Sequence, residues 1–201
     1  MKPDEARPIL DHLEELRWRI VKAGAAILLA AVVAFFFSDE LRHLLELPFH
    51  RAQPESQFQV ITPAEQWGVL MRIAFFGGLV LASPVVLYQI WAFINPALTQ
   101  KERRWAVPLI AVMVVLFVAG LVFGYWVLPR GLEFLLEIFP DVRNDLRLSD
   151  YYSFVLRFLF AFGCSFLYPV FVFAAAAADL ITSRQLASGR RWAVLAVVVV
   201  A

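Results

Sequence analysis

Four long apolar runs, separated by polar segments, dominate the pattern of hydrophobic and polar positions along the chain. They cover approximately residues 20–37, 67–94, 105–128 and 151–178. Each run is long enough to cross a bilayer core of about 30 Å as a helix that rises about 1.5 Å per residue. The pattern therefore predicts an all-α, polytopic helical membrane protein with four full spans.

A fifth apolar run begins at 193, and the sequence stops at 201. Because a run this short cannot cross a bilayer, we expect it to be the start of an incomplete fifth span. The second run is long for a single crossing, so we expect it to be tilted or kinked at Pro84. The third run is expected to end at Pro129.

The amino-terminal stretch "ILDHLEELRWRI", residues 9–20, repeats apolar side chains at helical spacing. This spacing predicts an amphipathic helix over 1–19 that lies along the membrane interface and leads into the first span. The segment 38–66 contains three prolines, which should interrupt any continuous helix there. We thus divide the chain into an interfacial helix (1–19) and a single transmembrane helical domain (20–201).

Composition agrees with a membrane protein, since 61% of residues are hydrophobic, 17% are charged and the mean hydropathy is +0.71. The chain has no Lys/Arg-rich stretch interleaved with aromatic residues, which argues against nucleic-acid binding. The single cysteine, Cys164, excludes an intrachain disulfide and a cysteine metal cluster. His12, His43 and His50 lack a metal-ligand spacing, so we expect no metal and no cofactor.

The distribution of Lys and Arg predicts the orientation of the spans. Eleven cations lie in residues 1–22 and in the gaps 95–105 and 179–192, whereas five lie in 38–66 and 129–150. Because cytoplasmic loops carry the excess of cations, this bias predicts a cytoplasmic amino terminus.

Two carboxylates then fall on the same face of the membrane, each at the mouth of a span. Glu15 can pair with Arg19 one helical turn away, and that pair alone would account for it. Glu102 completes the capping box Thr99-Gln100-Lys101-Glu102, which would equally account for it. Together, however, two acids at one interface suit a ligand with adjacent guanidinium groups, which bind carboxylates bidentately.

Four motifs resemble the TatC family, the polytopic core component of the twin-arginine protein translocase. They are "HLEELRWRI", "TPAEQW", "PVVLYQIWAFINPALTQKERR" and "YYSFVLRFLFAFGCSFLYP", in the family's order from about residue 9 to the end. The resemblance implies six spans in the family, no enzymatic activity and a location in the cell inner (cytoplasmic) membrane. It also implies an oligomeric complex with the single-span proteins TatA and TatB.

The resemblance further implies that Glu15 and Glu102 receive the paired arginines of the signal peptides of folded cargo proteins. Arg17, Phe93 and Arg104 match other positions of the same motifs and are expected to support this site. Pro48 and Glu65 match further motif positions and are expected to support the fold.

One position departs from the family pattern. Where the fourth-span motif has a glutamate that is thought to contact partner helices, this chain has Leu167. We expect this position to face partner helices, so that a glutamate introduced there would be tolerated. Arg72 and Arg157, the other charges within spans, are interpreted as anchors whose side chains reach the interface.

Two other classes of function remain as alternatives. A secondary transporter of a small solute would need two related halves with broken spans, for which Pro84 and Pro169 are weak indications. An intramembrane enzyme would need a nucleophile with a nearby base, and Cys164 and Ser165 have no histidine or acid close to them in sequence.

Overall fold

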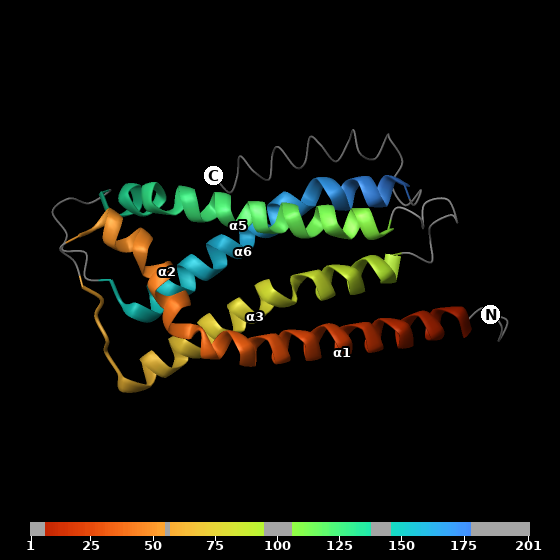
Figure 1. Cartoon of the computed structure of the whole chain (residues 1–201), viewed down its shortest axis with the longest axis horizontal. Helices are drawn as coiled ribbons and strands as arrows, with labels where there is room; N and C mark the ends of the chain where they lie inside the picture. The colour runs from red at the N-terminus through yellow and green to blue at the C-terminus, as the bar shows by residue number, and fades with distance from the viewer. Residues whose placement is uncertain (1–6, 55–56, 95–105, 138–145, 178–201) are drawn as a thin grey trace.

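The computed structural model describes residues 7–54, 57–94, 106–137 and 146–177. Five helices make up nearly all of this part of the chain (Figure 1). They are α1 (Arg7–Phe36), α2 (Ser38–Ala52), α3 (Pro63–Ile94), α5 (Ala106–Glu137) and α6 (Leu148–Ala177).

Four of the five helices are long and apolar enough to cross a membrane, which confirms the four predicted spans. The apolar segments are Leu13–Phe36, Pro63–Phe93, Val107–Glu137 and Leu148–Val172. Their outward faces carry exposed apolar side chains such as Leu29 and Phe36, as expected of helices whose surroundings are lipid rather than water.

The helices form two pairs, α1 with α3 and α5 with α6 (Figure 1). The shorter helix α2 lies at the end of the bundle opposite the amino terminus and contacts both α3 and α5. We call this the α2 end of the bundle, and the other the amino-terminal end. The α2 end also contains the starts of α3 and α6 and the last turns of α5.

Glycines allow close contact within each pair. A Cβ atom at Gly78 of α3 would collide with the backbone of Ala31 in α1. A Cβ atom at Gly120 of α5 would come within 2.6 Å of the carbonyl oxygen of Phe162 in α6. The absence of side chains at these positions lets the backbones approach, as is common between helices in membranes.

Two buried clusters hold the helices together. The larger cluster lies at the α2 end and joins α2, α3, α5 and α6 through residues such as Phe49, Ile73, Leu128 and Tyr151. The smaller one joins α3, α5 and α6 nearer the amino-terminal end and consists of Leu87, Trp91, Met113, Phe117, Leu167 and Val170. Helix α1 contributes to neither cluster and packs mainly against α3.

Three details differ from the sequence-based expectations. Helix α1 is continuous from Arg7 to Phe36, so its amphipathic first turns extend in line with the span instead of forming a separate interfacial helix. Helix α5 passes through Pro129 and ends at Glu137. Pro48 lies inside α2, where no continuous helix was expected. Proline is tolerated within such helices when neighbouring groups satisfy the backbone groups it leaves free.

Candidate functional site

Glu15 belongs to a chain of polar side chains that connects α1 to α3 at the amino-terminal end. The Glu15 Oε1 atom accepts hydrogen bonds from Nε of Arg19, at 3.0 Å, and from Nη2 of the same guanidinium. Arg19 Nη1 in turn donates to Oε1 of Gln89 in α3, at 3.5 Å. The ion pair between Glu15 and Arg19 that the sequence predicted is thus confirmed, and it is anchored to a second helix.

Both members of this ion pair retain access to the surroundings. The Glu15 side chain is 35% exposed and that of Arg19 is 22% exposed. Arg17, two residues further on, is exposed, and Phe93 near the end of α3 is partly buried. Glu15 therefore presents a carboxylate that is already bound by a guanidinium and is still accessible.

The other predicted acid cannot be placed relative to Glu15. Glu102 and Arg104 lie outside the described residues, in the segment that connects Ile94 of α3 to Ala106 of α5. The proximity of the two acids therefore stays a prediction.

Gln89 is the residue of this site that sequence reasoning missed. It is an amide within an otherwise apolar run, and it lies in the quoted "LYQIW" stretch. A polar side chain in such a run usually has a partner on a neighbouring helix, and this was the signal that could have identified it.

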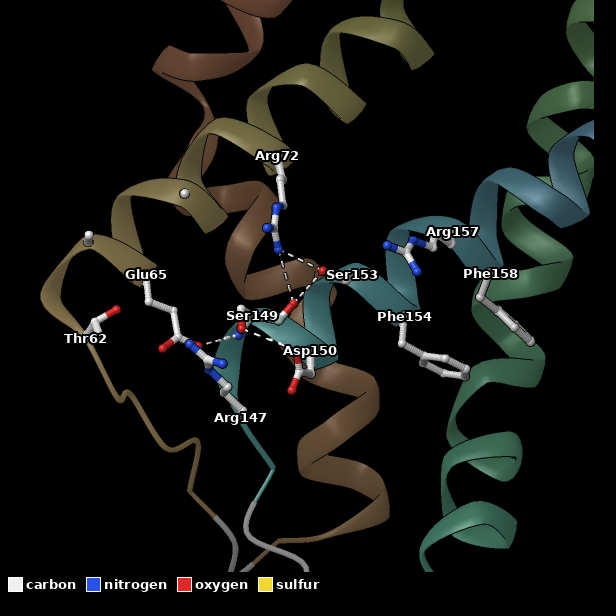
Figure 2. A pocket seen from close by; sticks show the side chains of 12 residues that line it. Thr62, Glu65, Arg72, Arg147, Ser149, Asp150, Ser153, Phe154, Arg157 and Phe158 are labelled. Carbon is white, nitrogen blue, oxygen red and sulfur yellow. Dashed lines mark hydrogen bonds and ion pairs between the residues drawn. The ribbon is translucent and has the colours of Figure 1, made fainter.

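Glu65 lies at the α2 end and binds the start of α6 to the segment before α3. Its Oε1 atom accepts from Nε of Arg147 at 3.0 Å and from the backbone N–H of Ser149 at 2.9 Å (Figure 2). Its Oε2 atom accepts from the backbone N–H of Ile61 at 3.1 Å. Because Ser149 is in the first turn of α6, the carboxylate also caps that helix.

Pro48 creates a free carbonyl in α2 that the rest of the fold satisfies. Proline has no N–H, so the carbonyl of Leu44 lacks its usual donor four residues later. The hydroxyl of Tyr125 in α5 donates to this oxygen at 2.8 Å. The hydroxyl of Tyr151 in α6 donates to the next carbonyl, that of Leu45, at 2.6 Å. Pro48 itself is fully buried. The fold-supporting roles of Pro48 and Glu65 stay predictions, and these contacts show what each residue would hold in place.

The expectation for Leu167 was wrong. Its side chain is 5% exposed and lies in the smaller cluster together with Trp91 and Met113. Among the described residues, the position is thus part of a closed apolar core. The indole Nε1 of Trp91 in the same cluster is buried and has no hydrogen-bond partner in the structure, so this core is almost entirely apolar.

Four apolar spans around buried clusters, with an accessible polar site at one end, define the class of the molecule as a polytopic, all-helical membrane protein. The family model described as "Sec-independent protein translocase protein (TatC)" matches residues 11–201. The chain therefore belongs to the TatC family, and it is a component of the Sec-independent, or twin-arginine, protein translocase.

Individual relatives agree with this assignment. The chain is 37% identical over 189 residues to the Aquifex aeolicus Sec-independent protein translocase protein TatC, which covers 92% of this chain and 79% of that protein. It is 34% identical over 173 residues to the Escherichia coli K12 protein of the same name, which covers 85% of this chain and 67% of that protein.

The fold is also similar to solved structures. The crystal structure of the twin-arginine translocase receptor TatC in DDM matches with a TM-score of 0.82 and 37% identity, over 90% of this chain and 82% of that one. As a translocase component, the chain acts in a membrane protein complex with other components of the same machinery. These findings favour translocation over the alternative of a solute transporter.

Proposed function

We propose that this chain is the subunit of the translocase that binds twin-arginine signal peptides. Glu15 and Glu102 would accept the two guanidinium groups, with Arg17, Phe93 and Arg104 supporting the site. The observation that carries this proposal is the contact between Glu15 and Arg19, in which the carboxylate accepts two N–H groups from one guanidinium. A signal-peptide arginine presents the same group.

An incoming arginine would have to displace Arg19 from Glu15. Exposed ion pairs of this kind contribute only about 0–1 kcal/mol, so the exchange costs little. Arg19 would keep its hydrogen bond to Gln89 after the exchange. The internal pair therefore supports a role for Glu15 as a receptor that is held in position before the ligand arrives.

Recognition must extend beyond the two acids. A hydrogen bond to a charged group contributes about 1.5–3 kcal/mol, whereas micromolar binding requires about 8 kcal/mol. The apolar part of the signal peptide, docked along the exposed apolar faces of the spans, would supply part of the difference. Recruitment of TatA and TatB would supply more. In this proposal the chain lies in the inner (cytoplasmic) membrane with its amino terminus in the cytoplasm, where the cation bias places it, and it carries out no chemical step.

The test is crosslinking of a twin-arginine peptide to the full chain in membranes, with Glu15→Gln and a matched control, Glu14→Gln. Glu14 is the neighbouring acid on the same helix and is exposed. We expect Glu15→Gln to reduce crosslinking about tenfold, because it removes a charge-assisted bond. Glu14→Gln should leave crosslinking within about twofold, since a general surface charge contributes little. Glu102→Gln should behave as Glu15→Gln does.

Membrane insertion of each variant is measured in parallel. Equal losses of crosslinking in the Glu14 and Glu15 variants would mean that only the general surface charge matters. This result would refute the proposed role of Glu15 as a receptor. Normal crosslinking in both the Glu15 and Glu102 variants would refute it as well.

A further inference from the structure

A polar pocket opens at the α2 end between the starts of α3 and α6. It has a volume of about 1020 Å³, and its lining includes three arginines and two acids, namely Arg72, Arg147, Arg157, Glu65 and Asp150 (Figure 2). Three cations against two anions leave a formal charge of +1. Because Arg147 is paired with Glu65, the two arginines of the spans outnumber Asp150, the remaining acid.

Arg72 and Arg157 come from two helices in contact, α3 and α6, and line the same pocket. Each is nine residues after the first residue of its helix, Pro63 in α3 and Leu148 in α6. Nine residues correspond to about 14 Å along each helix axis. Both side chains are exposed, and Figure 2 shows both guanidinium groups directed into the space beside Ser153.

The hydrogen bonds of the two arginines differ. Arg72 Nη1 donates to Oγ of Ser153 at 2.8 Å and to the carbonyl oxygen of Ser149 at 3.4 Å. Arg157 has no hydrogen bond or ion pair within the part of the chain that the structure describes. At least one guanidinium therefore lacks an anion, in a helix segment apolar enough to span the membrane. Cations in such segments are costly unless an anion or water meets them.

An apolar groove continues from the same two arginines. It has a volume of about 950 Å³ and shares Arg72, Ser153 and Arg157 with the polar pocket. The rest of its lining is apolar and comes from α1, α3 and α6, for example Leu28, Phe75 and Phe160. The two arginines thus lie where the polar pocket meets the apolar groove.

We infer that this junction binds an anionic phospholipid of the leaflet at the α2 end. The phosphodiester would lie between Arg72 and Arg157, and an acyl chain would fill the groove. Arginine is the side chain whose planar fork matches phosphate oxygens bidentately. The groove volume is at the upper end of the range of about 300–1,000 Å³ that is usual for small-molecule sites. A free anion would use the arginines but would leave the groove empty.

The test measures lipid retained by the purified full chain in native mass spectrometry, with phosphatidylglycerol and with diacylglycerol of the same acyl chains. We expect phosphatidylglycerol to be retained about tenfold better, since charge-assisted bonds require the phosphate. Arg157→Gln should lower phosphatidylglycerol retention several-fold and Arg72→Gln/Arg157→Gln at least about tenfold. Millimolar inorganic phosphate should not displace the lipid.

The control is Arg130→Gln. Arg130 lies in α5 at the same end, with its guanidinium 5.0 Å from the ring centre of Trp126, and it lines neither pocket. Its substitution should leave lipid retention unchanged. Because Arg157 donates no hydrogen bond in the described structure, its single variant should fold normally and remain informative if the double variant does not. Equal retention of diacylglycerol, displacement by phosphate, or full retention in the Arg157 variant would each overturn the inference.

Discussion

The two ends of the bundle are held together in different ways. At the α2 end, a buried cluster joins four helices, and the Glu65 carboxylate and the Tyr125 and Tyr151 hydroxyls satisfy backbone groups of distant segments. At the amino-terminal end, the smaller cluster joins three helices, and Arg19 of α1 donates a hydrogen bond to Gln89 of α3.

This difference suggests that one end of the bundle contributes mainly to stability and the other mainly to ligand binding. An end in which buried polar groups all have partners is expensive to rearrange, because each lost partner leaves a group unsatisfied. At the amino-terminal end, the partly exposed pair of Glu15 and Arg19 can exchange one of its groups for that of a ligand at little cost. We therefore propose that the α2 end serves as the scaffold and that the amino-terminal end serves in recognition.

The largest expected effect tests whether the smaller cluster, near the amino-terminal end, is as closed as the larger one. Leu167→Glu places a carboxylate in that core, where the structure offers no cation to pair with it among the described residues. We expect a loss of about 3–5 kcal/mol in the free energy of unfolding, measured by denaturation in detergent. Leu167→Met, which conserves volume, should cost less than about 1.5 kcal/mol. A small loss for Leu167→Glu, with better recovery of TatA or TatB, would show that the position faces partners after all.

A somewhat smaller effect is expected at the α2 end itself. Glu65→Ala leaves Arg147 and the backbone N–H groups of Ser149 and Ile61 without their acceptor. We expect a loss of about 3 kcal/mol in stability, since the buried carboxylate accepts three hydrogen bonds and a bond to a charged group contributes about 1.5–3 kcal/mol. Glu65→Gln keeps one acceptor oxygen and should lose less. If Glu65→Ala instead reduced peptide crosslinking without a loss of stability, Glu65 would belong to the recognition site.

The smallest of these effects concerns the carbonyl that Pro48 leaves free. Tyr125→Phe removes the hydroxyl that donates to Leu44 and should reduce stability by about 1 kcal/mol. The matched control is Tyr88→Phe, because Tyr88 is 52% exposed and its hydroxyl has no hydrogen bond in the described structure. An equal change in the two variants, in the same denaturation assay, would mean that the Tyr125 hydrogen bond contributes nothing.

The spans were predictable because their apolar runs are long and their lengths match a bilayer. The continuation of α5 past Pro129 was not, since local rules place a helix end at proline and take no account of tertiary partners. Helix α2 was missed for the same reason, because the donors that satisfy its carbonyls come from α5 and α6.

Among the polar contacts, too, some could be predicted from the sequence and others could not. The pair between Glu15 and Arg19 depends on spacing within one helix and could be predicted. The contact to Gln89 joins residues 70 positions apart, and those of Glu65 with Arg147 and Ser149 join residues more than 80 positions apart. No local pattern in the sequence specifies such pairs. Leu167 is the reverse case. Its motif position predicted contact with partner helices, but the side chain is buried in the smaller cluster.

The most direct test of the division between the two ends is amide hydrogen exchange of the full chain, with and without a twin-arginine signal peptide. On peptide addition we expect slower exchange at the start of α1 and the end of α3, around Glu15 and Gln89. We expect no change in α2 or in the first turns of α6. Protection confined to the α2 end, with none around Glu15, would contradict the proposed division between the two ends.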